Sequence, residues 1–152
     1  MTNISAIRLR MEFTECAEQL GAYGRLNSPH KIASAFKQLT RMQESPSEEF
    51  WALFLSSKLE ITGVEMISKG SLNTSIVHPR EVYKSAVLHN SAAICVAHNH
   101  PSGDPTPSQN DINITRRLQE AGHILGIEFL DHIIIGGGGT NIHQSLGELG
   151  YV

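Results

Sequence analysis

The chain has 152 residues and a formal net charge of -3, from 12 Lys and Arg against 15 Asp and Glu. This length fits a single domain with a sizeable core and leaves no room for a second catalytic domain. The slightly acidic balance creates no bulk attraction to phosphate backbones or anionic membranes, so charge gives nucleic-acid binding no support and no membrane partner is expected.

The compartment is indicated by cysteine usage and by the N-terminus. Cys16 and Cys95 lie far apart and offer no disulfide framework, which is compatible with a reducing compartment. Residues 1–5 lack the basic stretch and apolar core of a secretory signal, and no apolar run approaches the length of a membrane span. We therefore expect a soluble, cytoplasmic protein, with an oligomeric state that the sequence leaves open.

The first third of the chain is predicted to be helical. The apolar spacing between Ile4 and Leu20 becomes helical in its second half. Residues 28–39 begin with a serine cap and a proline and carry apolar residues on one stripe, which predicts a second helix. A connector around Pro46 then separates an N-terminal helical segment, residues 1–45, from a main domain, residues 46–152.

The main domain is predicted to alternate between strands and helices, which indicates an α/β fold. Its apolar, β-branched runs predict strands at residues 50–55, 59–67, 92–97 and 127–135, with a short last strand near 140–143. Helices are expected at residues 78–89 and from 108 to about 121, with Gly122 ending the second one.

A candidate metal site follows the apolar run of residues 92–97. His98 and His100 lie at the end of this predicted strand, and because residues two apart share a face, both rings can converge on one ion. A proline-rich turn then leads to a helix whose first turn carries Asp111. Two imidazoles and a carboxylate would leave a fourth position for water, which is how catalytic zinc is held.

Two structural interpretations of the same residues stay open at this point. Ser108 and Asp111 also form a helix-capping pattern, with a hydroxyl at the N-cap and an acid three residues later. The two histidines alone are also compatible with a solvated strand end. The capping role of Ser108 is compatible with a role of the same residue in the site.

The spacing of these residues resembles a known signature. A His-x-His-Pro pattern, a serine eight residues after the second histidine and an aspartate three residues after that serine are typical of JAMM (MPN+) metalloproteases, and the match comprises His98, His100, Pro101, Ser108 and Asp111. Residues 98–108, 78–82 and 130–132 resemble the RadC-like branch of that superfamily. The resemblance covers roughly residue 45 to the C-terminus, and it implies a three-layer sandwich around a mixed β-sheet, a cytidine deaminase-like core.

The resemblance also implies roles for individual residues. Zn²⁺ would be held by His98, His100 and Asp111. The RadC-type pattern Glu-x-Phe-x-x-Leu-x-Leu selects Glu48 as the general base, with Glu49 as the runner-up, because strand alternation lets only one of them face the site. Ser108 would hydrogen-bond the oxyanion formed during attack.

The function implied is that of a zinc-dependent metallohydrolase. It would be a metalloprotease or isopeptidase that cleaves an amide bond of a protein or peptide substrate with a water activated by the zinc ion. The alternative is a DNA repair or recombination protein of RadC type without hydrolase activity. Against it, no helix-hairpin-helix repeat is recognisable in the sequence. Asp131 and His132, polar residues in an apolar strand, are expected either to steady the metal ligands or to form an ordinary polar pair.

Overall fold

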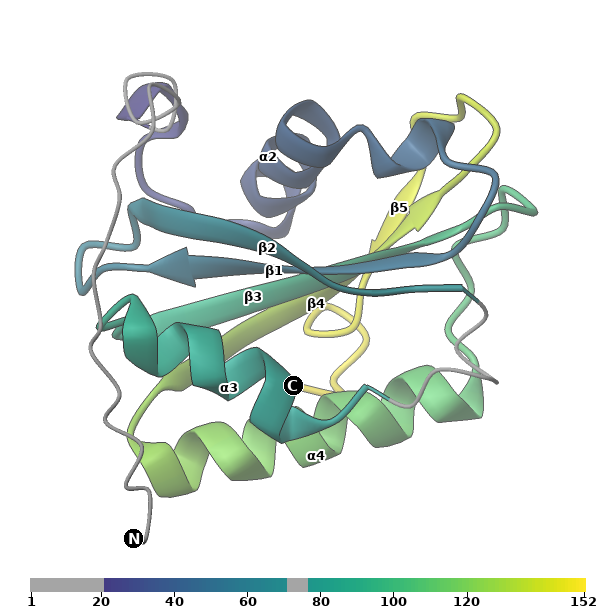
Figure 1. Ribbon diagram of the computed structural model, residues 1–152. Helices are drawn as coiled ribbons and strands as arrows, with labels where there is room; N and C mark the ends of the chain where they lie inside the picture. The colour runs from purple at the N-terminus through teal and green to yellow at the C-terminus, as the bar shows by residue number, and fades with distance from the viewer. Residues whose placement is uncertain (1–20, 71–76) are drawn as a thin grey trace, which may run out of the picture.

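A computed structural model describes residues 21–70 and 77–152 of the chain. Its centre is a five-stranded sheet with the strand order β2-β1-β3-β4-β5 (Figure 1). The strands are β1 (Glu49–Leu55), β2 (Ile61–Lys69), β3 (Ala93–His100), β4 (Glu128–Gly136) and β5 (His143–Ser145). Only β3 and β4 run parallel, and the other neighbours are antiparallel, so the predicted mixed sheet is confirmed.

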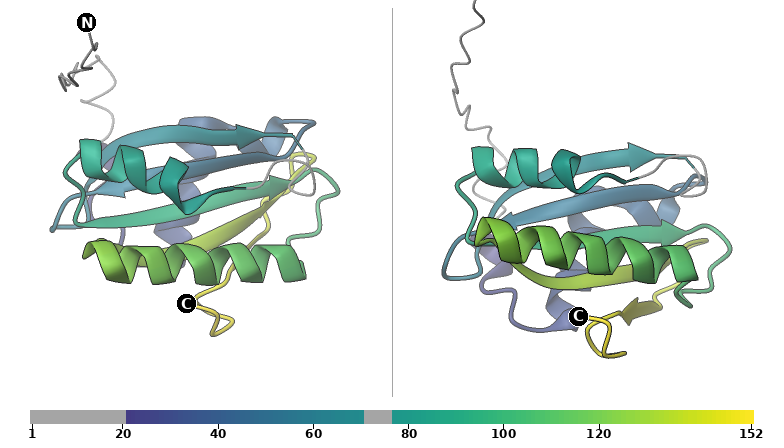
Figure 2. Two further views of the ribbon diagram at one scale, coloured as in Figure 1. Left: turned by 60° about the horizontal axis from the view of Figure 1, so that its bottom comes forward. Right: turned by 90° about the horizontal axis from the view of Figure 1, so that it is seen from below.

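Helices cover both faces of this sheet. The helix α2 (Pro29–Thr40) lies on one face, and α3 (Pro79–Leu88) and α4 (Gln109–Leu125) lie on the other (Figures 1 and 2). Two short 3-10 helices, η1 (Gly21–Tyr23) and η2 (Met42–Glu44), flank α2. The α4 helix connects the two parallel strands, as a parallel pair requires. The predicted three-layer α/β sandwich is therefore confirmed.

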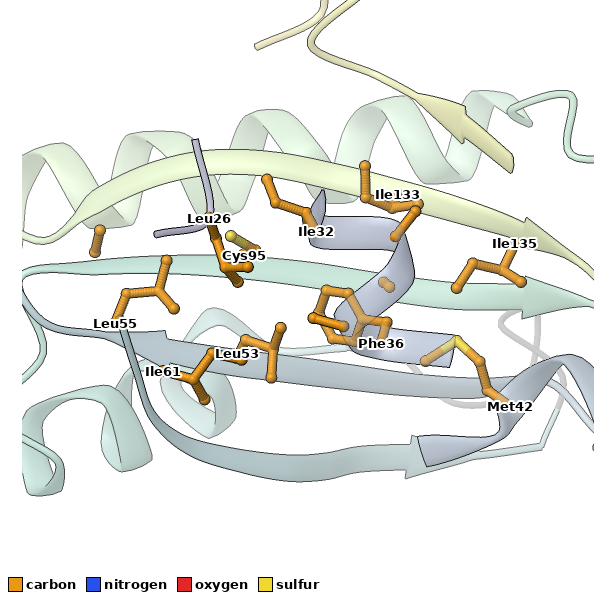
Figure 3. Close-up of a cluster of buried hydrophobic side chains, with 14 residues drawn as sticks. Leu26, Ile32, Phe36, Met42, Leu53, Leu55, Ile61, Cys95, Ile133 and Ile135 are labelled. Atoms are coloured by element: carbon orange, nitrogen blue, oxygen red, sulfur yellow. The ribbon is translucent and has the colours of Figure 1, made fainter. Parts of the chain in front are cut away.

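The two faces of β1 and β3 supply two separate cores. Alternate residues point to opposite faces, so Leu53 and Cys95 pack beneath Phe36 of α2, whereas Phe54 and Ile94 pack against α3 and α4. Figure 3 shows the α2-facing cluster between the helix and the sheet. Because both faces are buried, β3 reads in the sequence as a continuous apolar run rather than an alternating one.

The α2 helix starts and ends where its sequence predicts. The Ser28 hydroxyl accepts the backbone N–H of Lys31, and Pro29 occupies the first turn. Arg41, in the left-handed conformation, ends the helix. The helix lies N-terminal of the boundary predicted at residues 45–46 and shares its core with the sheet. Residues 1–20 of the predicted N-terminal segment lie outside the described residues, so the boundary itself stays a prediction.

The end of α4 differs from the sequence-based expectation. The helix continues through Gly122 to Leu125, and Gly126 (φ +70°) supplies the left-handed C-cap instead. Gly122 instead allows Tyr83 and the backbone of Ile127 to approach the helix closely. A Cβ at this position would collide with the Tyr83 hydroxyl and with the Ile127 carbonyl oxygen. That hydroxyl donates to the carbonyl of Leu118 at 2.7 Å, so the glycine allows α3 to dock on α4.

Two strand boundaries also shift. Leu59 adopts a left-handed backbone (φ +62°) in the hairpin turn, with its N–H bonded to the carbonyl of Ser56, so β2 begins at Ile61 rather than at residue 59. The last strand begins at His143, because the preceding loop includes two glycines with positive φ, Gly138 and Gly139. Among the described residues, no helix combines the length and apolar character needed to cross a membrane.

Candidate metal centre

The two predicted histidine ligands lie at the end of β3, whose neighbours fix their position. His98 stands opposite Phe50 of β1 and Ile134 of β4. The strand's pleat places His98 and His100 on the face that α4 covers, and Asn99 on the opposite face. His98 is fully buried, whereas the side chain of His100 is 15% exposed. His98 is therefore enclosed by the protein, whereas part of the His100 ring is accessible to solvent.

Asp111 approaches these rings from the first turn of α4. The hydroxyl of Ser108 accepts the backbone N–H of Asp111 at 3.2 Å, and Asp111 Oδ2 accepts the backbone N–H of Ser108 at 2.7 Å. This reciprocal capping box fixes the start of the helix and the rotamer of the aspartate. The residue is 1% exposed, so its carboxylate lies beneath the surface, beside the two rings.

The three side chains converge within hydrogen-bond distance of one another. His98 Nε2 lies 2.9 Å from His100 Nε2 and 3.2 Å from Asp111 Oδ1. His100 Nε2 lies 3.5 Å from Asp111 Oδ2. The opposite ring nitrogens have other partners, since His98 Nδ1 lies 2.8 Å from His132 Nε2 and His100 Nδ1 lies 2.8 Å from the carbonyl oxygen of Asp104. Each ring therefore turns its Nε2 atom toward the carboxylate.

This arrangement fits a divalent cation. Tetrahedral bonds of about 2.0–2.2 Å to nitrogen and oxygen place neighbouring ligand atoms about 3.3–3.6 Å apart. The two histidine-to-carboxylate separations, 3.2 and 3.5 Å, are close to this range, and the two Nε2 atoms, at 2.9 Å, lie nearer to each other. The potential ligand atoms of His98, His100 and Asp111 all lie within 4.8 Å of one another. Asp111 Oδ1 is buried and accepts no hydrogen bond from the described residues. A buried carboxylate oxygen without a donor is costly, and a cation between the three side chains would satisfy it.

Comparisons with known proteins identify the family of this chain. A family model described as the RadC-like JAB domain matches residues 26–151. The chain belongs to the RadC-like JAB domain family. It is 52% identical over 113 residues to a UPF0758 protein of Moorella thermoacetica, covering 74% of this chain and 48% of the relative. It is also 48% identical over 128 residues to a UPF0758 protein of Clostridium beijerinckii, covering 84% of this chain and 54% of the relative.

A third relative shows a higher identity over a shorter stretch. This UPF0758 protein of Methanosarcina acetivorans is 57% identical over 98 residues, which cover 64% of this chain and 43% of the relative. The JAB-domain chain thus spans about half the length of the curated relatives it matches. The relatives' names state no activity.

Asp111 and His100 shift each other's pKa in the site of this JAB domain. Burial alone would raise the pKa of Asp111, but the close contacts with the His100 and His98 rings outweigh it and hold that pKa well below its usual range. The same contact with Asp111 raises the pKa of His100, against the lowering effect of burial. The carboxylate is therefore ionised and ready to bind a cation.

Glu48 directly precedes β1 and Glu49 is the first residue of that strand, so alternation directs their side chains to opposite faces of the sheet. Glu49 is buried on the α2 side, where its carboxylate accepts from Trp51 Nε1 at 2.9 Å and from the Ser45 hydroxyl at 2.9 Å and forms an ion pair with Lys69 at 3.1 Å. Alternation places Glu48 on the same face as Phe50, which stacks on the ring of His98. Glu48 is also close enough to His100 to contribute to its raised pKa.

Asn99 connects the histidine strand to the segment that carries Glu48. Its Oδ1 accepts the backbone N–H of Glu49 at 2.7 Å, and its Nδ2 donates to the carbonyl of Ser47 at 3.0 Å and to that of Ser45 at 3.4 Å. The side chain is completely buried. Asn99 therefore fixes the backbone on both sides of Glu48. From the sequence, strand alternation indicates only that its side chain points away from the two histidines.

The two polar residues of β4 behave differently. His132 contacts His98 directly, whereas Asp131 binds the C-terminal turn, accepting from the Ser145 hydroxyl at 2.6 Å and the Gly147 N–H at 3.0 Å. Of the two predicted partners of the metal ligands, the structure thus brings only His132 to the site. Sequence reasoning did not identify Thr115, which lies 2.7 Å from His132 Nδ1. Its position one helical turn after Asp111 was the available signal.

Proposed function

We propose that this RadC-like JAB domain is a zinc-dependent metallohydrolase that cleaves amide bonds, acting as a metalloprotease or isopeptidase on a protein or peptide substrate. The observation that carries the proposal is the convergence of His98, His100 and Asp111 around a buried carboxylate oxygen without a donor. Two imidazoles and one carboxylate suit zinc, and three protein ligands are typical of catalytic rather than structural zinc sites. A zinc ion in such a site lowers the pKa of a coordinated water to about 7 and polarises a substrate carbonyl.

Glu48 is the proposed general base. Its place on the His98 face and its electrostatic contact with His100 support this role. The contacts of Glu49 with Trp51, Ser45 and Lys69 count against the competing candidate. Glu48 would take a proton from the attacking water and pass it to the leaving nitrogen. Asn99 would keep the Glu48 backbone next to the histidine strand during both transfers.

Ser108 is the proposed oxyanion partner. Its Oγ uses a lone pair to accept the N–H of Asp111, which leaves the hydroxyl proton available for a substrate oxygen. The residue is exposed at the start of α4, and its backbone N–H donates to Asp111 Oδ2, the oxygen that lies 3.5 Å from His100 Nε2. A donor at this position would stabilise the charge that develops on the carbonyl oxygen during attack.

Metal analysis is the first test. Purified wild-type protein is expected to contain one zinc ion per chain, and His100→Ala is expected to lose it, because two of three ligands cannot hold the ion tightly. Elemental analysis after dialysis, together with calorimetric titration of the metal-free protein, measures both. A wild-type protein that takes up no zinc, or a variant that binds it equally well, would overturn the proposal.

The second test separates catalysis from metal binding. On a panel of fluorogenic peptides and lysine isopeptide conjugates, the wild type should show hydrolysis that a chelator abolishes. Glu48→Gln should keep its zinc but lose about 10²–10⁴-fold in rate, the usual contribution of a general base. Glu49→Gln is the matched control, because it removes the neighbouring charge on the opposite face and should retain activity. Equal losses in both variants would reject Glu48 as the base.

A further inference from the structure

A chain of buried hydrogen bonds leads from the proposed metal ligand His98 back into α4. His98 Nδ1 lies 2.8 Å from His132 Nε2, and His132 Nδ1 lies 2.7 Å from the hydroxyl of Thr115. The same hydroxyl lies 2.7 Å from the backbone carbonyl of Asp111. His98, His132 and Thr115 are all completely buried, so their donors and acceptors have to be matched within the protein.

The direction of this chain is fixed at Thr115. A carbonyl oxygen only accepts hydrogen bonds, so the single hydroxyl proton of Thr115 points to the carbonyl of Asp111. The short contact between Thr115 Oγ1 and His132 Nδ1 then needs a proton from the ring. His132 therefore carries its proton on Nδ1.

The next contact follows from the first. His132 is completely buried, and no carboxylate in residues 21–70 or 77–152 forms a hydrogen bond or ion pair with its ring, which favours the neutral ring. A neutral ring protonated on Nδ1 has a bare Nε2. This bare nitrogen accepts from His98, so His98 carries its own proton on Nδ1. The Nε2 atom of His98, which faces His100 and Asp111, is then left with a free lone pair.

We propose that Thr115 is a positioning residue of the metal centre, which selects through His132 the His98 tautomer that leaves Nε2 free to bind the cation. This inference rests on the proposed zinc site and adds a residue on the far side of it. The other tautomer of His98 would place a proton on the atom that has to bind the metal. A ligand histidine is commonly oriented by a partner on its second nitrogen, and here that partner is itself set by a threonine on the helix that carries Asp111.

The site contains an internal reference for this inference. His100 donates from Nδ1 to the backbone carbonyl of Asp104 at 2.8 Å, which fixes its tautomer without any help from Thr115. A change at Thr115 should therefore alter the protonated nitrogen of His132 and His98 but leave that of His100 unchanged.

The test compares Thr115→Val, which keeps the shape but lacks the hydroxyl, with Thr115→Ser, which keeps the hydroxyl. Long-range ¹⁵N–¹H correlation spectra of the metal-free, imidazole-labelled protein, at a pH where the rings are neutral, report the protonated nitrogen of each histidine. Zinc affinity is measured in parallel by competition with a chromogenic chelator, and thermal unfolding checks that the variants fold.

The wild type and Thr115→Ser are expected to show protons on Nδ1 of His98 and His132. Thr115→Val should show mixed tautomers for these two rings and an unchanged His100, with zinc affinity reduced about 10- to 100-fold, the usual cost of losing an outer partner. Wild-type His98 protonated on Nε2 would overturn the inference without any variant. Unchanged tautomers and affinity in Thr115→Val would also overturn it, whereas failure of the wild type to bind zinc would reject the metal centre itself.

Discussion

The carboxylate of Asp111 serves a helix cap and the candidate metal centre at once: Oδ2 accepts the backbone N–H of Ser108 at 2.7 Å, while the buried Oδ1 has no hydrogen-bond donor among the described residues. One side chain therefore ties the start of α4 to the end of β3. The cap orients the carboxylate toward the histidines before any metal arrives, and such preorganisation lowers the cost of binding.

The two roles of Asp111 can be separated by substitution. Asp111→Asn keeps an oxygen that can accept from Ser108, so the cap should survive while zinc is lost, because a neutral amide is a poor zinc ligand. Asp111→Ala should lose the cap as well and unfold with a free energy about 1 kcal/mol lower than Asp111→Asn. Urea titration of the metal-free proteins and zinc analysis measure the two effects. Stoichiometric zinc in Asp111→Asn would contradict the ligand assignment.

Asn99→Ala should weaken the link between the Glu48 segment and β3. The substitution leaves the Glu49 N–H and the Ser47 carbonyl without their buried partner, and an unmade buried hydrogen bond costs about 1–3 kcal/mol. Hydrogen exchange should accelerate at the Glu49 amide, and amide hydrolysis should fall while the zinc content stays at the wild-type level. Asn113→Ala, at an exposed site on α4, is the control. Unchanged protection of the Glu49 amide would show that Asn99 does not hold this segment.

The buried Glu49 predicts a pH-dependent contribution to stability. Burial alone would raise its pKa, but hydrogen bonds from Trp51, Lys69 and Ser45 outweigh it and lower the pKa below the ordinary value of 4.5. A depressed folded-state pKa stabilises the protein above pH 4.5, and this contribution is lost as the pH falls through the lowered value. Wild type should therefore exceed Glu49→Gln in unfolding free energy near neutral pH, with the difference shrinking in acid. A difference independent of pH would contradict this origin.

Gly122→Ala should destabilise the protein even though alanine is the better helix former by about 1 kcal/mol. The added methyl would collide with the Tyr83 hydroxyl and the Ile127 carbonyl, so α3 and the start of β4 would have to move. Glu120→Ala, at an exposed position of the same helix, should be neutral or slightly stabilising. In thermal unfolding, combining Gly122→Ala with Tyr83→Phe should cost less than the sum of the single variants. Simple additivity would show that the Tyr83 contact is not responsible.

The local features of this fold were predictable because local chemistry decides them. The Ser28 cap and Pro29 predicted the start of α2, and the apolar run before His98 predicted a strand buried on both faces. The end of α4 was not predictable in this way. In the sequence, Gly122 is typical of a residue that ends a helix. In the structure it lies against Tyr83 of α3, and the local sequence pattern does not indicate a contact between two helices.

The sequence by itself determined the proposed ligand set, because the strand end, the proline-rich turn and the helix cap place His98, His100 and Asp111 within one short stretch of chain. Tertiary structure alone decided what surrounds that set. His132 and Asn99 reach their partners across neighbouring strands and loops, and the pairing of β1 with β3 decides which of Glu48 and Glu49 comes near the histidines. Spacing along the chain encodes contacts within a turn or a strand. Contacts between elements depend on how buried surfaces pack, and only the folded chain fixes that.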